Sequence, residues 1–192
     1  MNDPFRVVFA VVICSQAFGL GWWKRPFRPK SLTGQLPGKG RAMPQSLAKV
    51  YLHVVFSTKN REPLLAEAWR EELFCVLGGA ANDLGCQSLI VGGMADHVHL
   101  LFQLGRTITI ADAVGKIKST SSLWIGQKHL GVERFHWQAG YAALSVSQAN
   151  VEAVRAYLRD QPDHHRKQSF QDELREWLRR YEIAWDERYV WD

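Results

Sequence analysis

Two histidines separated by one residue are the first candidates for chemistry in this chain. In the stretch HVHLLFQL, the two-residue period of a β-strand places His97 and His99 on one face, and the alternate positions form an apolar face for the core. We therefore expect the two imidazoles to point away from the packed side of the sheet. Same-face neighbours lie roughly 7 Å apart along a strand, so both imidazoles can reach one cation. The alternative is a pair of half-exposed histidines on a solvated sheet face, because H-x-H also arises by chance.

A tyrosine and a glutamine four residues apart form the second candidate. In VEAVRAYLRDQPDHH, Tyr157 and Gln161 fall on one helix face, one turn apart. A phenol is a potential nucleophile, and an amide oxygen is a potential ligand for a hard cation. Spacing alone favours the plainer alternative, in which Tyr157 is half-buried packing and Gln161 is a solvated helix end.

Basic side chains near these candidates could contact a phosphate backbone. They are Lys116 and Lys118 on the exposed side of an expected helix, and Arg155 and Arg159 on either side of the tyrosine. Each is more often a solvated surface charge than a phosphate contact.

Length and composition fit one domain with one core. The 192 residues, 46% of them hydrophobic, can bury a core of ordinary size. The three cysteines form no C-x-x-C pair and indicate neither a disulfide framework nor a zinc knuckle, so we expect a cytoplasmic location. The net charge of +5 does not argue for nucleic acid, because residues 1–42 hold seven bases against one acid and residues 43–192 hold 17 against 18.

Residues 1–42 differ in composition from the rest of the chain. An apolar run from Phe5 to Trp23 is followed by a basic stretch rich in proline and glycine. The run lacks a clean cleavage site for a signal peptide, and polar residues and glycines interrupt it as a membrane helix. Met43 opens a stretch that soon enters a strand. We therefore expect residues 1–42 to be an extension, either disordered or an over-extended start, and residues 43–192 to be the domain.

The candidate residues depend on an alternating series of strands and helices. Periodicity and turn residues predict strands over 49–58, 86–91 and 97–104, a further strand region over 135–146 that contains the turn-like pair Ala139-Gly140, and helices over 64–84, 109–128, 151–160 and 170–181. This order predicts an α+β, ferredoxin-like split βαβ antiparallel sheet with helices on one face, followed by a C-terminal helix that bears the tyrosine. His53, on the first strand, either neighbours the site or fills a polar face.

Four segments in a fixed order carry a family resemblance. They are DHVHLLF, WQAGYAALSVS, YLRDQ with PDHH just beyond, and IAWDERYVWD. Over residues 46–192 they resemble the HUH single-tyrosine transposases of bacterial insertion sequences and their REP-associated relatives. The resemblance implies a Mg²⁺ or Mn²⁺ ion bound by His97, His99 and Gln161, with Tyr157 as the nucleophile. The near-neutral domain departs mildly from a DNA enzyme and argues against tight non-specific binding.

The activity that this resemblance implies is nicking and rejoining of single-stranded DNA at hairpin-bearing element ends. Attack by the tyrosine oxygen gives a 5′-phosphotyrosine and a free 3′-hydroxyl. The resemblance also implies a homodimer, whose tyrosine helix packs on its own histidine strand or, as we favour, on the partner's; no membrane association is expected. Two other functions stay open: a domesticated hairpin-DNA-binding protein without strand transfer, and a small metal-dependent hydrolase that uses an acid such as Asp96.

Overall fold

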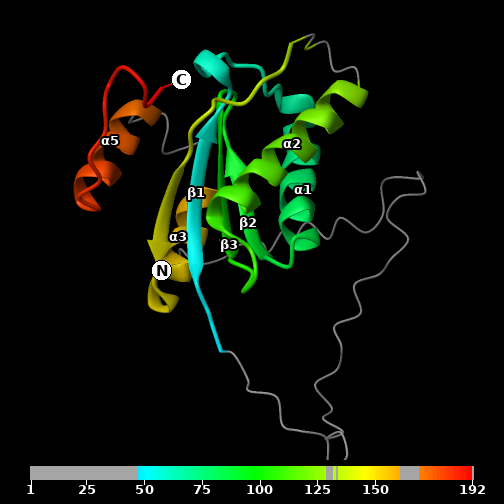
Figure 1. Ribbon diagram of the computed structural model, residues 1–192. Helices are drawn as coiled ribbons and strands as arrows, with labels where there is room; N and C mark the ends of the chain where they lie inside the picture. Colours follow the sequence, from blue (N-terminus) through cyan, green and yellow to red (C-terminus); the bar gives the residue numbers. More distant parts are fainter. Residues whose placement is uncertain (1–46, 129–131, 133, 161–168, 192) are drawn as a thin grey trace, which may run out of the picture. The chain divides into compact units, whose positions relative to one another are not determined.

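A four-stranded antiparallel sheet organises the part of the chain that the computed structural model describes, residues 47–128, 132, 134–160 and 169–191. Its strands are β1 (Tyr51–Ser57), β2 (Gln87–Gly93), β3 (His97–Gln103) and β4 (Ala142–Val146), in the order β2-β3-β1-β4 (Figure 1). Helix α1 (Glu67–Asp83) connects β1 to β2, and α2 (Ile110–Lys128) connects β3 to β4. This topology confirms the α+β, ferredoxin-like split βαβ fold.

Helices α1 and α2 cover one face of the sheet with an apolar layer (Figure 1). Alternate residues of the two central strands point into this layer: Leu52, Val54 and Phe56 of β1, and Val98, Leu100 and Phe102 of β3. Helix α1 ends where Gly85 takes a left-handed conformation, with a φ of +75°, which glycine adopts without strain. The alternation of apolar residues along the strands makes this layer possible, and its burial is the main contribution of the strands to the stability of the fold.

The opposite face is covered by α3 (Val151–Arg159) and α5 (Phe170–Arg180), which follow the short turn η2 (Gln148–Asn150). Helix α3 packs on Tyr51 and Leu101, and α5 packs on Val55. The sequence interpretation left the histidine face outside the packed side of the sheet, and this was wrong. The apolar stripe of α5 needs a partner surface, and that face supplies one.

The last strand is shorter than expected. A strand was predicted over 135–146, but β4 begins at Ala142, and before it only Trp137 forms an isolated bridge, with Thr58. The intervening backbone turns instead, and its carbonyl groups at Gln138 and Gly140 accept hydrogen bonds from Lys118. The other predicted strands and helices differ from the observed ones by at most three residues at either end.

Three further expectations concern the chain as a whole. The predicted extension, residues 1–42, lies outside the described residues, so its boundary at Met43 stays a prediction. Within the described ranges, no helix is long and apolar enough to cross a membrane. Cys86 is a buried free thiol.

Candidate active site

The two histidines of β3 lie side by side on the face covered by α3 and α5. Their ring centroids are 5.0 Å apart, and their exposed fractions are 1% for His97 and 0% for His99. In the antiparallel register, His97 lies opposite Ser57 and His99 opposite Val55. The two rings thus lie on one face of the strand, as the two-residue period predicted. Because both are buried, the alternative of two half-exposed histidines on a solvated sheet face is excluded.

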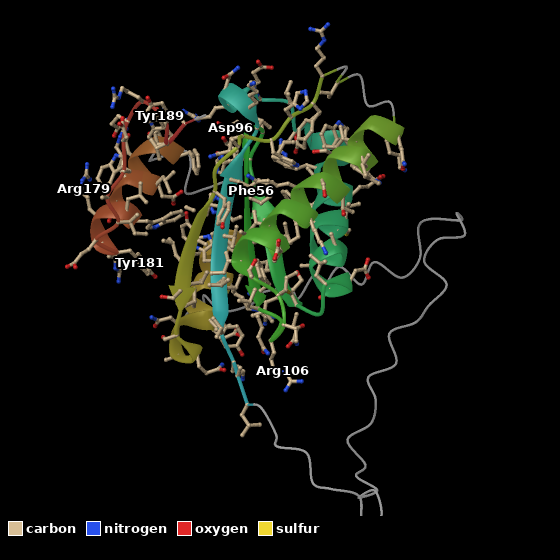
Figure 2. The ribbon with its side chains drawn as sticks, in the orientation of Figure 1. Phe56, Asp96, Arg106, Arg179, Tyr181 and Tyr189 are labelled. Atoms are coloured by element: carbon tan, nitrogen blue, oxygen red, sulfur yellow. The ribbon has the colours of Figure 1, made fainter. Side chains whose placement is uncertain are left out.

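His97 is held by a carboxylate next to it in the chain. Its Nδ1 lies 2.7 Å from Oδ1 of Asp96, whose Oδ2 in turn accepts a hydrogen bond of 2.9 Å from Arg61. Burial alone would raise the pKa of Asp96, but His97 and Arg61 together lower it to about 2. Burial lowers the pKa of His97, although the neighbouring carboxylate acts in the opposite direction. Because its pKa is lowered, the imidazole is neutral at pH 7. Asp96 lies at the opposite end of the sheet from Arg106 (Figure 2).

His99 is held by a third histidine, on the adjacent strand. Nε2 of His53 lies 3.1 Å from Nδ1 of His99, and the two rings stack with centroids 5.3 Å apart. Burial lowers the pKa of His53 to about 4, so this ring is also neutral at pH 7. Of the two sequence interpretations of His53, the structure confirms that it neighbours the site.

The chemistry of these side chains fits a divalent cation. Asp96 and His53 each engage the Nδ1 atom of one β3 histidine, so Nε2 is the nitrogen that each ring would present to a metal. Gln161, the expected third ligand, lies outside the described residues. Among those described, no group of three or more His, Cys, Asp or Glu side chains could hold a metal. A metal centre with two histidines and an amide therefore remains an expectation that the donor chemistry supports.

Tyr157 lies over the histidines of its own chain. Its ring centroid is 6.3 Å from that of His99 and 6.4 Å from that of His53. Helix α3 approaches β2 closely, because a Cβ atom at Gly92 would lie only 2.9 Å from the backbone oxygen of Leu158. In the single chain, the tyrosine and the histidines lie together, and packing of α3 on a partner's histidine strand stays a prediction.

Helix α5 adds three side chains that the sequence interpretation missed. Phe170 stacks on His97 with centroids 4.0 Å apart, and Trp177 lies against Tyr157 at 5.9 Å. Glu173, between them on the same stripe, accepts a hydrogen bond from the hydroxyl of Tyr157. Burial and then the charge of Glu176 raise the pKa of Glu173 to about 8. A glutamate inside an otherwise apolar stripe was the sequence feature that could have identified it.

The four basic candidates for DNA binding differ in their surroundings. The ammonium group of Lys118 donates to the backbone oxygens of Gln138 and Gly140, and burial lowers its pKa to about 8. Arg155 is half-buried and donates to the backbone oxygen of Leu89. Lys116 and Arg159 are exposed. The structure thus gives Lys118 and Arg155 structural contacts, and a role for any of the four in DNA binding stays a prediction.

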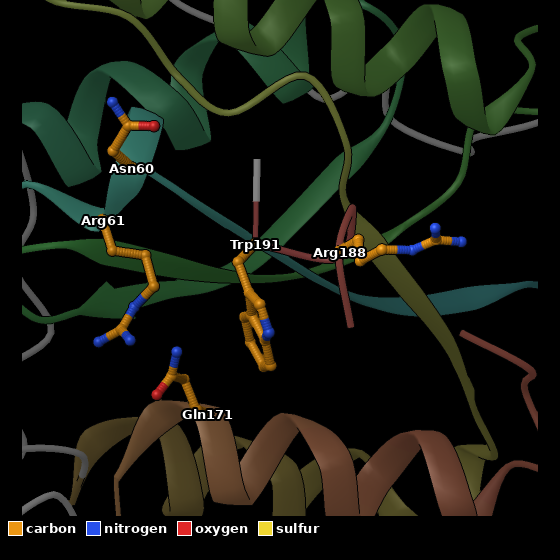
Figure 3. Close-up of a pocket in the computed structure, with 5 residues that line it drawn as sticks. All are labelled: Asn60, Arg61, Gln171, Arg188 and Trp191. Carbon is orange, nitrogen blue, oxygen red and sulfur yellow. The ribbon is translucent and has the colours of Figure 1, made fainter. Parts of the chain in front are cut away.

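A pocket of about 330 Å³ opens beside the Arg61 and Asp96 pair. It is lined by Asn60, Arg61, Gln171, Arg188 and Trp191. The guanidinium of Arg61, the amide of Gln171 and the indole of Trp191 converge, whereas Arg188 points away from them (Figure 3). These residues come from η1 (Lys59–Arg61), α5 and the C-terminal segment, and no local sequence pattern linked them.

Comparison with known proteins places this site in a family. The model of the family described as IS200-like transposases matches residues 46–161, which contain the histidine strand, Tyr157 and Gln161. A crystal structure of a Deinococcus radiodurans R1 protein assigned as a transposase shares the fold. That structure has 22% identity and a TM-score of 0.51, over 64% of this chain and 98% of its own.

A second solved structure is a REP-associated tyrosine transposase bound to a REP hairpin, with 13% identity and a TM-score of 0.48, over 66% of this chain and 74% of its own. No curated protein matches the chain. Because the family model covers more than half of the sequence, this chain belongs to the IS200-like transposases.

Proposed function

We propose that this transposase nicks and rejoins single-stranded DNA at hairpin-bearing ends through a 5′-phosphotyrosine intermediate. The observation that carries the proposal is the position of Tyr157, whose phenol ring lies beside His99 on the buried face of the sheet. A phenol next to the imidazoles of His99 and His53 brings a potential nucleophile to a potential metal site. Membership in a transposase family supports DNA as the substrate.

Each residue of the site has its own role in this reaction. A Mg²⁺ or Mn²⁺ ion held by His97, His99 and Gln161 would polarise the scissile phosphodiester. The Tyr157 oxygen attacks the phosphorus, the bond from phosphorus to O3′ breaks, and a 3′-hydroxyl leaves. The phosphotyrosine retains the energy of the phosphodiester, so a second 3′-hydroxyl can reverse the step without ATP. Asp96 and His53 orient the two imidazoles throughout, as partners of metal-binding histidines usually do.

The pocket beside Arg61 suits an unpaired nucleotide next to the scissile phosphate. An indole offers a stacking surface for any base, and a guanidinium attracts a phosphate. Arg61 is also hydrogen-bonded to Asp96, which in turn contacts His97, so a strand bound there would approach the histidines. The near-neutral charge of residues 43–192 is compatible with this local mode of recognition, which does not need a broad basic surface.

A covalent adduct is the test of this function. The full chain, incubated with a 5′-hairpin-bearing oligonucleotide and Mg²⁺ or Mn²⁺, should yield a protein–DNA adduct that survives denaturing electrophoresis. Tyr157→Phe should abolish the adduct and leave hairpin binding intact, because only the nucleophile is removed. Tyr141→Phe, at an exposed tyrosine, is the matched control and should react normally. EDTA should stop the wild type, and undiminished cleavage by Tyr157→Phe would exclude the mechanism.

A further inference from the structure

A buried carboxyl group is in contact with the tyrosine hydroxyl. Glu173, on α5, is 3% exposed and accepts a hydrogen bond at Oε1 from the Tyr157 hydroxyl. Its neighbours on the same helix stripe are Phe170, Leu174 and Leu178, which pack on Val55 of the sheet. Packing alone does not require a carboxyl group at this position, because an apolar side chain there would bury more surface at no electrostatic cost.

The chemistry of a tyrosine nucleophile requires a proton acceptor. The unperturbed pKa of tyrosine is about 10, so the phenol is almost fully protonated at neutral pH and is a weak nucleophile in that form. A general base has to lie within hydrogen-bonding reach of the proton that it removes. Glu173 meets this condition, because its carboxyl oxygen is the acceptor of the Tyr157 hydroxyl.

We propose that Glu173 is the general base that activates Tyr157, a role that rests on the proposed function of this site. As the Tyr157 oxygen forms its bond to phosphorus, the phenol proton moves to the Glu173 carboxylate. The bond from phosphorus to O3′ breaks, and the leaving O3′ takes a proton from water. When a 3′-hydroxyl later attacks the phosphotyrosine, its proton passes to water and Glu173 returns a proton to the Tyr157 oxygen.

The surroundings of the pair tune this base toward neutral pH. Burial and the nearby charge of Glu176 raise the pKa of Glu173 to about 8. A carboxylate of that basicity accepts a proton from a phenol more readily than an exposed carboxylate does. The other titratable groups beside Tyr157 are His53 on β1 and His99 on β3. His97, also on β3, stacks on Phe170 of the helix stripe that carries Glu173.

The pH dependence of adduct formation distinguishes a base from a structural contact. In single-turnover reactions, the wild-type rate should rise with pH, reach half of its maximum near pH 8, where half of Glu173 is ionised, and level off at higher pH. Glu173→Gln keeps the shape of the side chain and a hydrogen-bond acceptor but cannot take the proton. We expect its rate to fall by about a hundredfold or more, with hairpin binding unchanged. Its rate should also keep rising in the pH range where the wild-type rate is level, because hydroxide has to remove the proton.

Two further variants complete the test. Glu176→Gln, at an exposed position one turn away, is the matched control. It should keep the wild-type maximum rate and shift the midpoint of the profile to lower pH, because one repelling charge is removed. Glu173→Asp keeps a carboxylate at a longer distance, so it should react more slowly than wild type but with a profile that still levels off.

The outcomes separate this proposal from the proposed function. If the wild type forms a Tyr157-dependent adduct and Glu173→Gln matches its rate and profile, Glu173 is not the base, although the transposase mechanism stands. If the wild type forms no adduct, the proposed function itself fails. If Glu173→Gln does not fold, as judged by circular dichroism, Glu173→Asp decides the question, and a rate for it that does not level off at high pH would overturn the proposal.

Discussion

The two faces of the sheet are built from alternate residues of the same strands, yet they are buried in different ways. The face under α1 and α2 is an apolar layer in which Phe56, Leu100 and Phe102 are almost fully enclosed. The face under α3 and α5 is just as enclosed at His97 and His99, but polar contacts hold these side chains.

This difference separates stability from chemistry along a single strand. Apolar burial is non-directional and tolerates exchanges of similar volume. A buried polar network depends on each partner, because a group that loses its hydrogen bond keeps the cost of its removal from water. Neighbouring residues of β3 should therefore respond to mutation in opposite ways.

The first prediction compares two adjacent residues of β3. Leu100→Ala should reduce the free energy of unfolding by about 2–5 kcal/mol, because it leaves a cavity in the apolar layer. His99→Asn should cost less stability and should abolish adduct formation, since it removes an expected metal ligand. Urea unfolding and the adduct assay measure the two effects. If His99→Asn still formed the adduct, the histidine face would not be the part of the sheet on which the chemistry depends.

The second prediction concerns whether one chain supplies both parts of the polar face. His97→Ala/His99→Ala and Tyr157→Phe are each expected to be inactive. Because α3 packs on the histidine strand of its own chain, mixing the two proteins should restore no adduct. Subunit exchange has to be shown separately, by co-purification of differently tagged copies. Recovery of a sizeable fraction of the activity would show that the helix crosses between the subunits of a dimer.

The third and smallest effect is expected at the edge of the polar face. Trp191→Ala should weaken binding of a hairpin with an unpaired 5′ extension by about tenfold, which is the loss of one stacked base. Binding of the blunt hairpin should not change, and fluorescence anisotropy measures both. Tyr189→Ala, at an exposed neighbouring ring, is the control. Equal losses for both DNAs would place Trp191 outside the path of the single strand.

The fold could be predicted because each strand and helix carries its own periodicity. The alternation in HVHLLFQL gave the two faces of β3, and the spacing of Tyr157 and Gln161 gave one helix face. The covering of the histidine face by α5 could not be read in this way, because periodicity shows that a helix has an apolar stripe but not which surface it covers. The strand region predicted over 135–146 is interrupted at its turn-like pair Ala139-Gly140. The sequence did not show that Lys118, on a distant helix, donates hydrogen bonds to the backbone there.

The partners of the site residues were harder to predict than the residues themselves. Asp96 was considered only as the acid of a hydrolase, but in the structure its carboxylate is occupied by His97 and Arg61. Glu173 lies 16 residues from Tyr157 along the chain, and its contact depends on how α3 and α5 meet over the sheet. Such contacts arise from tertiary packing, so no characteristic spacing of residues in the sequence indicates them.

The order of the elements also determines when this protein becomes capable of chemistry during its own synthesis. During synthesis the chain leaves the ribosome from its N-terminal side. The sheet and its apolar layer are complete in sequence by Val146, whereas Tyr157 and Glu173 are added later. A nascent chain can therefore bury its main core before its nucleophile leaves the ribosome. A product that terminates after β4 holds both histidines but lacks the residue to which DNA would become attached.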